Sequence, residues 1–450
     1  MNVIVPDDHG DWFNQRDTSF SRFLQIGGKT TLENSIFKRP IVGVCTNRDA
    51  WVYNSSITQI EKNVNRSVNA YFKAREAFIA SDKEDVKDRL ADARESVSGE
   101  ISWSRGLLQK LSKQKLISSF EPRKIQRSLY RPFVKQYLYY DREAFVEMPG
   151  KWPTIFSQKS TKNLIICSSG VDKQNNLIIC INQNSKDAGQ IALMTNHIVD
   201  LHFNGDTQCF PRWLPGEQTE KKDALDFGEF DEVPSGFTNE ALPHFQAAYP
   251  GKVMTEDDLF YYIYGILHSE DYRTRYANNL MKELPRIPRV ATYEQFMAFA
   301  NAGRKLADLH VNFEDVEPYA GIQIEYTKEG APSYRVKQMN WAKIKGKTGN
   351  AAKDKSTLIY NDWITVKNVP LEAQEYIVNK KSALDWVVER ARVSIDKASG
   401  IVNDFNDYAA EQGNERYPLD LFLKVITVSL ETTKIVKSLP PLEIHPLDKA

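Results

Sequence analysis

The segment 257–313 carries the longest helical periodicity in the sequence, and it constrains the fold more than any other stretch. Apolar residues that recur every three or four positions lie on one face of an α-helix. Pro285 and Pro288 end the first periodic half, because proline lacks an amide donor and clashes with the preceding turn. We therefore expect two helices joined by a proline-bounded step, which form a packed core and not a site of chemistry. The periodic residues are Tyr272, Tyr276, Leu280 and Leu284 in the first half, and Phe296, Phe299, Gly303, Leu306 and His310 in the second.

Length and charge set the broad class. A chain of 450 residues is long for one domain, so two or three domains are expected, and 41% apolar residues suffice for a substantial core. Lysine and arginine balance aspartate and glutamate at a net charge of +0. A chain of this kind has no overall attraction to nucleic acid or to a membrane surface, so a DNA partner would need a local basic face.

Cysteine usage indicates a reducing compartment. Cys45, Cys167, Cys180 and Cys209 are too few and too scattered for a disulfide framework, and no pair has the spacing typical of zinc ligands. No apolar run approaches the roughly 20 residues of a membrane span, and no signal peptide follows Met1. We expect a cytoplasmic protein without a membrane partner and without a metal site.

The chain divides into three parts that differ in composition and hydrophobic pattern. Residues 1–56 contain short extended pieces, 57–118 are charged and predict amphipathic helices, and alternating strand patterns begin near Phe120. The predicted fold class is α+β, with a helical spacer followed by a mixed, largely antiparallel sheet and packed helices. A long loop is expected at 214–256. The predicted strands are 163–167, 176–180, 198–203, 322–326, 334–339 and 357–364, and further helices are expected at 371–392 and 419–438.

The motifs that would signal catalysis are incomplete. Gly28-Lys29-Thr30 resembles the end of a phosphate-binding loop, but Phe23 occupies the place of the required first glycine. His197 and His202 lack a third ligand for a metal and are better interpreted as structural histidines. A nucleophile elbow, a dinucleotide fingerprint and the Asn-Pro-Pro-Tyr tetrapeptide of amino-methyltransferases are all missing from the sequence. We therefore predict no catalytic residue in this chain.

Two basic stretches are candidates for DNA binding. The first interleaves cations with tyrosines, and arginine forks can read guanine edges or clamp phosphates. The second is a lysine-rich loop that could follow a phosphate backbone and give salt-dependent affinity. An ordinary solvated face explains the first stretch equally well, and a mobile hairpin tip explains the second equally well. The candidate residues are Arg123, Lys124, Arg127, Arg131 and Lys135 in the first stretch, and Lys343, Lys345, Lys347, Lys353 and Lys355 in the second.

Eight long stretches, in order along nearly the whole chain, resemble the C-terminal region of type ISP restriction–modification enzymes. These bacterial enzymes join nuclease, helicase-like translocase, coupler, adenine methyltransferase and target recognition domains in one polypeptide. The stretches are IVPDDHGDWFNQRD (4–17), VGVCTNRDAWVYN (42–54), SLYRPFVKQYLYYDRE (128–143), HIVDLHFNGDTQCFP (197–211), YYIYGILHSEDYRTRYANNLMKELPRIP (261–288), AGRKLADLHVNFE (302–314), the segment from TLIYNDW to IVNDFND (357–407) and SLPPLE (438–443).

The resemblance implies a part of a larger enzyme. Residues 1–56 would be the tail of the methyltransferase region and a linker, 57–118 a helical spacer, and 119–450 the target recognition domain. The chain would recognise a short asymmetric duplex DNA sequence, while adenine methylation and translocation-coupled cleavage would belong to the methyltransferase and helicase-like domains of the same polypeptide. S-adenosylmethionine, ATP and Mg would bind only in those domains.

Two alternatives remain open at this point. The chain could be a structural or coupling module that docks onto the methyltransferase and translocase domains, with little DNA contact of its own. It could also complete a methyltransferase site that is supplied by another chain.

Overall fold

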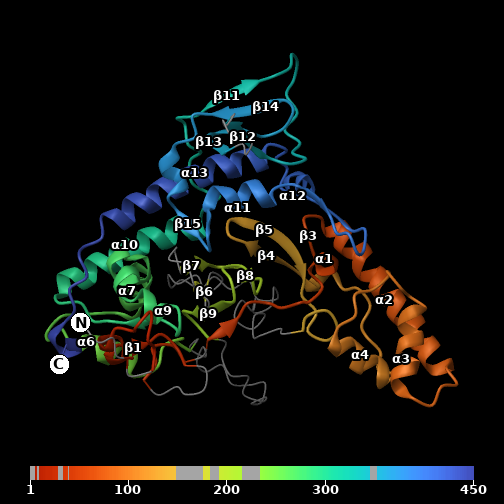
Figure 1. Cartoon of the computed structure of the whole chain (residues 1–450), viewed down its shortest axis with the longest axis horizontal. Helices are drawn as coiled ribbons and strands as arrows, with labels where there is room; N and C mark the ends of the chain where they lie inside the picture. Colours follow the sequence, from red (N-terminus) through yellow and green to blue (C-terminus); the bar gives the residue numbers. More distant parts are fainter. Residues whose placement is uncertain are drawn as a thin grey trace, which may run out of the picture.

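The computed structural model describes residues 6–7, 10–28, 34–38, 40–147, 176–182, 192–214, 234–344 and 352–449. Within these ranges three sheets have four strands each, and nearly all strand pairs are antiparallel (Figure 1). The first sheet has the order β2 (Ile41–Val42), β9 (Thr207–Pro211), β6 (Ile178–Asn182) and β7 (Ala192–Thr195). The second has the order β3 (Tyr53–Asn54), β5 (Val134–Tyr139), β4 (Ile125–Arg131) and β8 (Ile198–Val199). The third has the order β11 (Gln323–Tyr326), β14 (Ile364–Lys367), β13 (Ala352–Ile359) and β12 (Asn340–Ile344).

Shorter strand pairs and helices complete the fold. The pairs are β1 (Leu24–Gln25) with β10 (Arg286–Ile287), β15 (Ile377–Val378) with β16 (Lys381–Ser382), and β17 (Val393–Ile395) with β18 (Val402–Asp404). The helices outside the spacer are α1 (Asp49–Val52), α6 (Ala241–Gln246), α7 (Glu256–His268), α8 (Glu270–Arg275), α9 (Ala277–Leu280), α10 (Tyr293–Val311), α11 (Ala383–Arg390), α12 (Phe405–Glu411), α13 (Tyr417–Lys437) and α14 (Pro446–Lys449). This combination confirms the predicted α+β class.

The helices predicted within 57–118 are present and form an arm at one side of the molecule (Figure 1). They are α2 (Ile57–Ala80), α3 (Val86–Glu95) and α4 (Arg105–Ser112). Ser56 caps α2, since its side chain accepts a hydrogen bond from the amide of Gln59, and Ser104 caps α4 in the same way. The division at 56 and 118 stays a prediction.

The periodic segment forms the centre of one core. Helices α7 and α10 approach so closely that a Cβ added at Gly303 would lie 1.9 Å from the carbonyl oxygen of Tyr261. The predicted face of α10 is buried as expected. The first half differs from the prediction, because α8 and α9 replace one continuous helix. Ser269 begins a new helix by accepting a hydrogen bond from the amide of Tyr272, although the predicted apolar positions are still buried.

Two hydrophobic cores share one long helix. One core surrounds α7 and α10, and the other lies among the helical arm, the second sheet and the third sheet. The first half of α13 is buried in the second core, where Phe422 packs against Trp341 of β12. Its second half approaches α10, where Thr432 lies 2.9 Å from Nε2 of His310. Helix α13 therefore spans both cores, and Figure 1 shows it running from the third sheet toward α10.

Several predicted elements differ from the structure. Residues 334–339 form no strand, because the backbone of Tyr334 and Val336 is held by side chains of Tyr360 and Asn406. The strand expected at 198–203 ends at Val199 in a turn, and the loop expected at 214–256 contains α6. Residues 371–392 form a 3-10 helix, the β15–β16 hairpin and α11 instead of one helix. The strand at 163–167 lies outside the described residues. In the described part of the chain, no helix is long and apolar enough to cross a membrane.

Candidate nucleic-acid interface

Arg123 and Lys124 lie at the surface in a 3-10 helix (Pro122–Lys124) that leads into β4. The Arg123 side chain is 83% exposed and forms an ion pair of 2.5 Å with Glu121. Lys124 is less exposed and contacts Glu121 and Asp141. Burial lowers the pKa of Lys124, but the hydrogen bond to Glu121 and the charge of Asp141 outweigh it, and the pKa is raised. Both cations are charged and can reach solvent.

Arg127 and Arg131 lie on the same strand in different surroundings. Arg127 is exposed on β4. The Arg131 side chain is only 11% exposed, forms an ion pair of 2.6 Å with Asp200 and stacks 3.9 Å above the ring centroid of Tyr130. One terminal nitrogen of Arg131 donates to both Asp200 and the carbonyl of Tyr130, and little of the side chain reaches solvent, so these contacts favour an internal role for Arg131.

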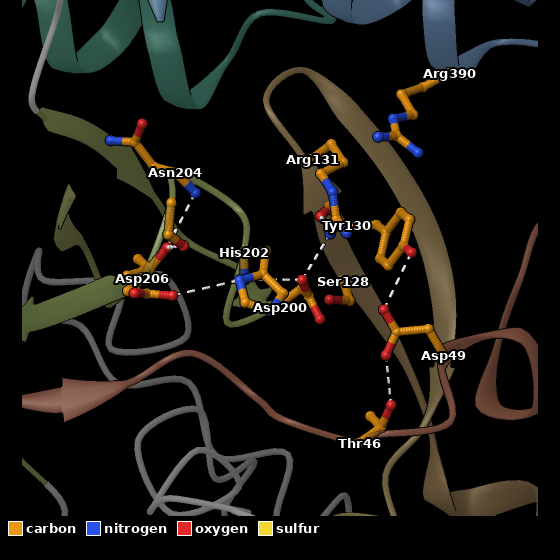
Figure 2. Close-up of polar contacts among 12 residues, drawn as sticks. Thr46, Asp49, Ser128, Tyr130, Arg131, Asp200, His202, Asn204, Asp206 and Arg390 are labelled. Atoms are coloured by element: carbon orange, nitrogen blue, oxygen red, sulfur yellow. Dashed lines mark hydrogen bonds and ion pairs between the residues drawn. The ribbon is translucent and has the colours of Figure 1, made fainter. Parts of the chain in front are cut away.

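Asp200 is the centre of a polar cluster that joins three segments, as Figure 2 shows. We call Asp49, Tyr130, Arg131 and Asp200 the Asp200 cluster. Tyr130 donates a hydrogen bond of 3.1 Å to Asp49, and Thr46 donates another of 2.5 Å to the same carboxylate. Burial raises the pKa of Asp200 to about 6, while Arg131 opposes this shift and Asp49 adds to it. Desolvation therefore outweighs the ion pair at this carboxyl group.

Lys135 belongs to the interior. It lies on β5, is only 7% exposed and forms an ion pair of 2.7 Å with Glu314. Tyr417 of α13 donates a hydrogen bond of 2.5 Å to the other oxygen of Glu314. The contact joins the second sheet to the end of α10 and to α13, which favours a structural role over a DNA contact.

The second basic stretch forms a hairpin of β12 and β13, which we call the lysine hairpin. Lys343 and Lys353 are directly opposite each other in its register, and both side chains are exposed. No ion pair of either lysine occurs within the described ranges. Like charges at opposite positions of antiparallel strands destabilise the pair, so this arrangement favours an anionic partner. Lys345 and Lys347 lie outside the described residues.

Helix α11 connects the two candidate regions. At its start, Lys355 of the lysine hairpin forms an ion pair with Asp385 and lies 4.8 Å from the ring centroid of Trp341. At its end, Arg390 points toward β4 and the Asp200 cluster (Figure 2). An eight-residue helix is about 12 Å long. The lysine hairpin and the Asp200 cluster thus lie near opposite ends of one short helix.

Arg390 and Arg392 are cations that the sequence interpretation did not select. Arg390 is one third exposed, and Arg392 is half-buried at the start of β17. Their spacing beside Trp386 repeats the basic-aromatic signal that drew attention to 123–142, so the same criterion could have found them.

Neither His197 nor His202 lies in a group of three potential metal ligands within the described residues. Burial lowers the pKa of His197 to about 3, so it is a neutral interior group, as expected. His202 differs from that expectation, since it is exposed beside Asp206 at 3.5 Å. It borders a cavity of about 250 Å³ lined also by Cys45, Thr46, Asn47, Arg48, Asp49, Asp200 and Leu201. The described residues contain no group of three potential metal ligands.

Comparison with known families decides what kind of domain carries these features. The chain matches the type ISP C-terminal specificity domain over residues 35–175 and 170–421. The chain belongs to this family. No curated protein matches the chain.

Three solved structures of similar proteins match nearly the whole chain. A nuclease-deletion mutant of the type ISP restriction–modification enzyme LlaGI, in complex with a DNA substrate mimic, is 32% identical with a TM-score of 0.76. The ATP-dependent type ISP enzyme LlaBIII bound to DNA is 29% identical with a TM-score of 0.78. A DrdV–DNA complex is 27% identical with a TM-score of 0.76.

The match covers 98% of this type ISP specificity domain in all three cases, but only 30%, 26% and 41% of the three relatives. The chain therefore spans less than half the length of each. Three of the stretches that carried the resemblance, 42–54, 128–143 and 197–211, supply the residues of the Asp200 cluster. These three stretches, which are far apart in the sequence, thus contact one another in the Asp200 cluster.

Proposed function

We propose that this type ISP specificity domain binds duplex DNA and recognises a short asymmetric sequence. In the parent enzyme it would direct adenine methylation and translocation-coupled cleavage by the methyltransferase and helicase-like domains, in the cytoplasm. S-adenosylmethionine, ATP and Mg would bind in those other domains. The relatives' DNA complexes support this proposal at the level of the family.

The lysine hairpin is the observation within the chain that carries the proposal most directly. Lys343 and Lys353 face each other, are exposed, and lack an ion pair within the described ranges. Their repulsion is unfavourable in the free protein and is relieved by a phosphate backbone, which neutralises both charges. Contacts of this kind position DNA without reading its sequence, so the base-reading residues are others.

The test is selection of bound duplexes from a random DNA pool at two salt concentrations. Enrichment of one short asymmetric sequence that survives the higher salt would support the proposal. Binding that disappears at the higher salt and enriches no sequence would contradict it, because it would indicate backbone attraction alone. The Lys343→Ala Lys353→Ala variant should bind more weakly, whereas Lys434→Ala on α13 serves as a matched control.

A second candidate function, docking onto another domain of the parent polypeptide, has an observation of its own. Trp12 and Phe13 are neighbours whose side chains are 57% and 81% exposed. Adjacent exposed aromatic residues are common at protein–protein contacts. Under this alternative, Trp12→Ala Phe13→Ala would weaken association with the methyltransferase domain and leave the DNA affinity of this chain unchanged.

A further inference from the structure

The end of α11 carries more positive charge than its surroundings neutralise. The Arg390 guanidinium has one ion pair in the described part of the chain, at 3.2 Å to the adjacent Glu389, and Glu389 is shared with Lys381. The Nε atom of Arg390 is buried and has no hydrogen-bond partner among the described residues. A buried N–H without a partner is costly, so the contacts within the fold do not fully satisfy this guanidinium.

Further cations surround this guanidinium. Figure 2 shows Arg390 pointing toward β4, on the side where Tyr130 and Arg131 lie. Burial, followed by repulsion from Arg131, lowers the pKa of Arg390, and Arg392 acts in the same direction. Glu389 and the Tyr130 hydroxyl oppose this shift. In the described ranges the Arg392 side chain has neither a hydrogen bond nor an ion pair, so the local charge remains positive.

An internal role explains only part of this arrangement. Arg390 lies at the C-terminal end of α11, where a cation is favourable, and its guanidinium is 5.9 Å from the ring centroid of Trp386. These contacts account for its position on the helix. These contacts leave the Nε atom of Arg390 without an acceptor and leave Arg392 without a partner. The excess positive charge of the two arginines is therefore not explained by contacts within the fold.

We propose that Arg390 and Arg392 bind a phosphate of the DNA backbone at the end of α11. A guanidinium presents a planar fork of donors that matches two phosphate oxygens. The two terminal nitrogens of Arg390, whose side chain is about one third exposed, would form that fork. Arg392 would provide a second cationic contact, and Arg131 would contribute positive potential from behind. This inference rests on the proposed function and adds a second phosphate contact about one helix length from the lysine hairpin.

The test measures the salt dependence of binding to a non-specific duplex by fluorescence anisotropy, with the full 450-residue chain. We expect Arg390→Gln Arg392→Gln to reduce the slope of log K against log salt by about two units. We expect the affinity at low salt to fall by about tenfold or more. The sequence preference should not change, because phosphate contacts carry no sequence information. Lys434→Gln is the control, since Lys434 is exposed on α13 and pairs with Glu431.

The two proposals fail in different ways. If the wild-type chain binds no duplex, the proposed function is wrong and the inference falls with it. If the wild type binds and the double variant keeps both affinity and slope, only the inference is wrong.

Circular dichroism establishes that the variants are folded. If the double variant is unfolded, Arg390→Lys decides, because it keeps the charge and removes the fork. We then expect an unchanged slope with weaker binding, and unchanged affinity would overturn the inference.

Discussion

Two regions of this domain use the same residue type for opposite purposes. On β5, Lys135 is buried and paired with Glu314, whereas on the lysine hairpin Lys343 and Lys353 are exposed and oppose each other. The first arrangement compensates a desolvated charge within the fold. The second leaves charge available for a partner. A lysine in a basic-aromatic stretch is therefore not a DNA contact until its carboxylate neighbours are known.

The largest effect should come from the interior pair. Lys135→Ala leaves the half-buried Glu314 without its cation, and removing one partner of a largely buried pair is strongly destabilising. We expect a loss of about 3 kcal/mol in the free energy of unfolding, measured by urea denaturation. The salt slope of DNA binding should stay the same where the variant is folded. A stable variant with a lower slope would place Lys135 with the DNA contacts.

The next effect concerns the pH dependence of the Asp200 cluster. The pKa of Asp200 is raised to about 6 in the folded state, chiefly by burial, so the native state binds the proton more tightly than the unfolded chain does. Its contribution to stability is fully present below the unfolded pKa of 3.8 and is lost as pH rises through about 6.

The variant Asp200→Asn should abolish this dependence. We expect the stability of the wild type, measured relative to the variant, to fall by roughly 2 kcal/mol between about pH 4 and pH 7. Urea unfolding of both proteins across this range is the measurement. A wild type that gains stability relative to the variant over the same range would show that the Arg131 ion pair outweighs burial.

Substitutions in the lysine hairpin should change stability and DNA binding in the opposite way to the substitution at Lys135. We expect Lys343→Ala Lys353→Ala to leave stability unchanged or to raise it by up to about 0.5 kcal/mol, because repulsion across the strands is removed. The slope of log K against log salt should fall by about two units. A loss of stability with an unchanged slope would show that these lysines support the fold instead.

The smallest effect is expected at Arg123. Its side chain is almost fully exposed, and its partner Glu121 is only two residues away, so its loss should not measurably change the unfolding midpoint. Because Glu121 neutralises part of its charge, Arg123→Ala should reduce the salt slope by less than about one unit. A full unit would place Arg123 among the phosphate contacts together with the lysine hairpin.

Sequence periodicity predicted the helical core well and the strands less well. The face of α10 from Phe296 to His310 is buried as expected, because the hydrophobic pattern and the packing of a long helix have the same period. Residues 334–339 alternate like a strand, yet side chains of Tyr360 and Asn406 satisfy their backbone instead. Such long-range contacts leave no trace in the local pattern.

The sequence predicted which basic residues belong to the candidate interface, but it did not predict which carboxylates pair with them. The basic residues were visible in the sequence, whereas the carboxylates that neutralise Arg131 and Lys135 are 69 and 179 residues away along the chain. Arg390 and Arg392 carried a basic-aromatic signal of the same kind, and only the fold brings Arg390 to the side of β4.

Helix α13 gives the molecule a mechanical property. Its 21 residues form a rod about 32 Å long, with Phe422 under β12 near one end and Thr432 seated against α10 toward the other. The lysine hairpin and α10 therefore contact the same continuous helix at positions about 15 Å apart. A load on the third sheet would be carried along this helix into the core around α10, and not taken up by a loop.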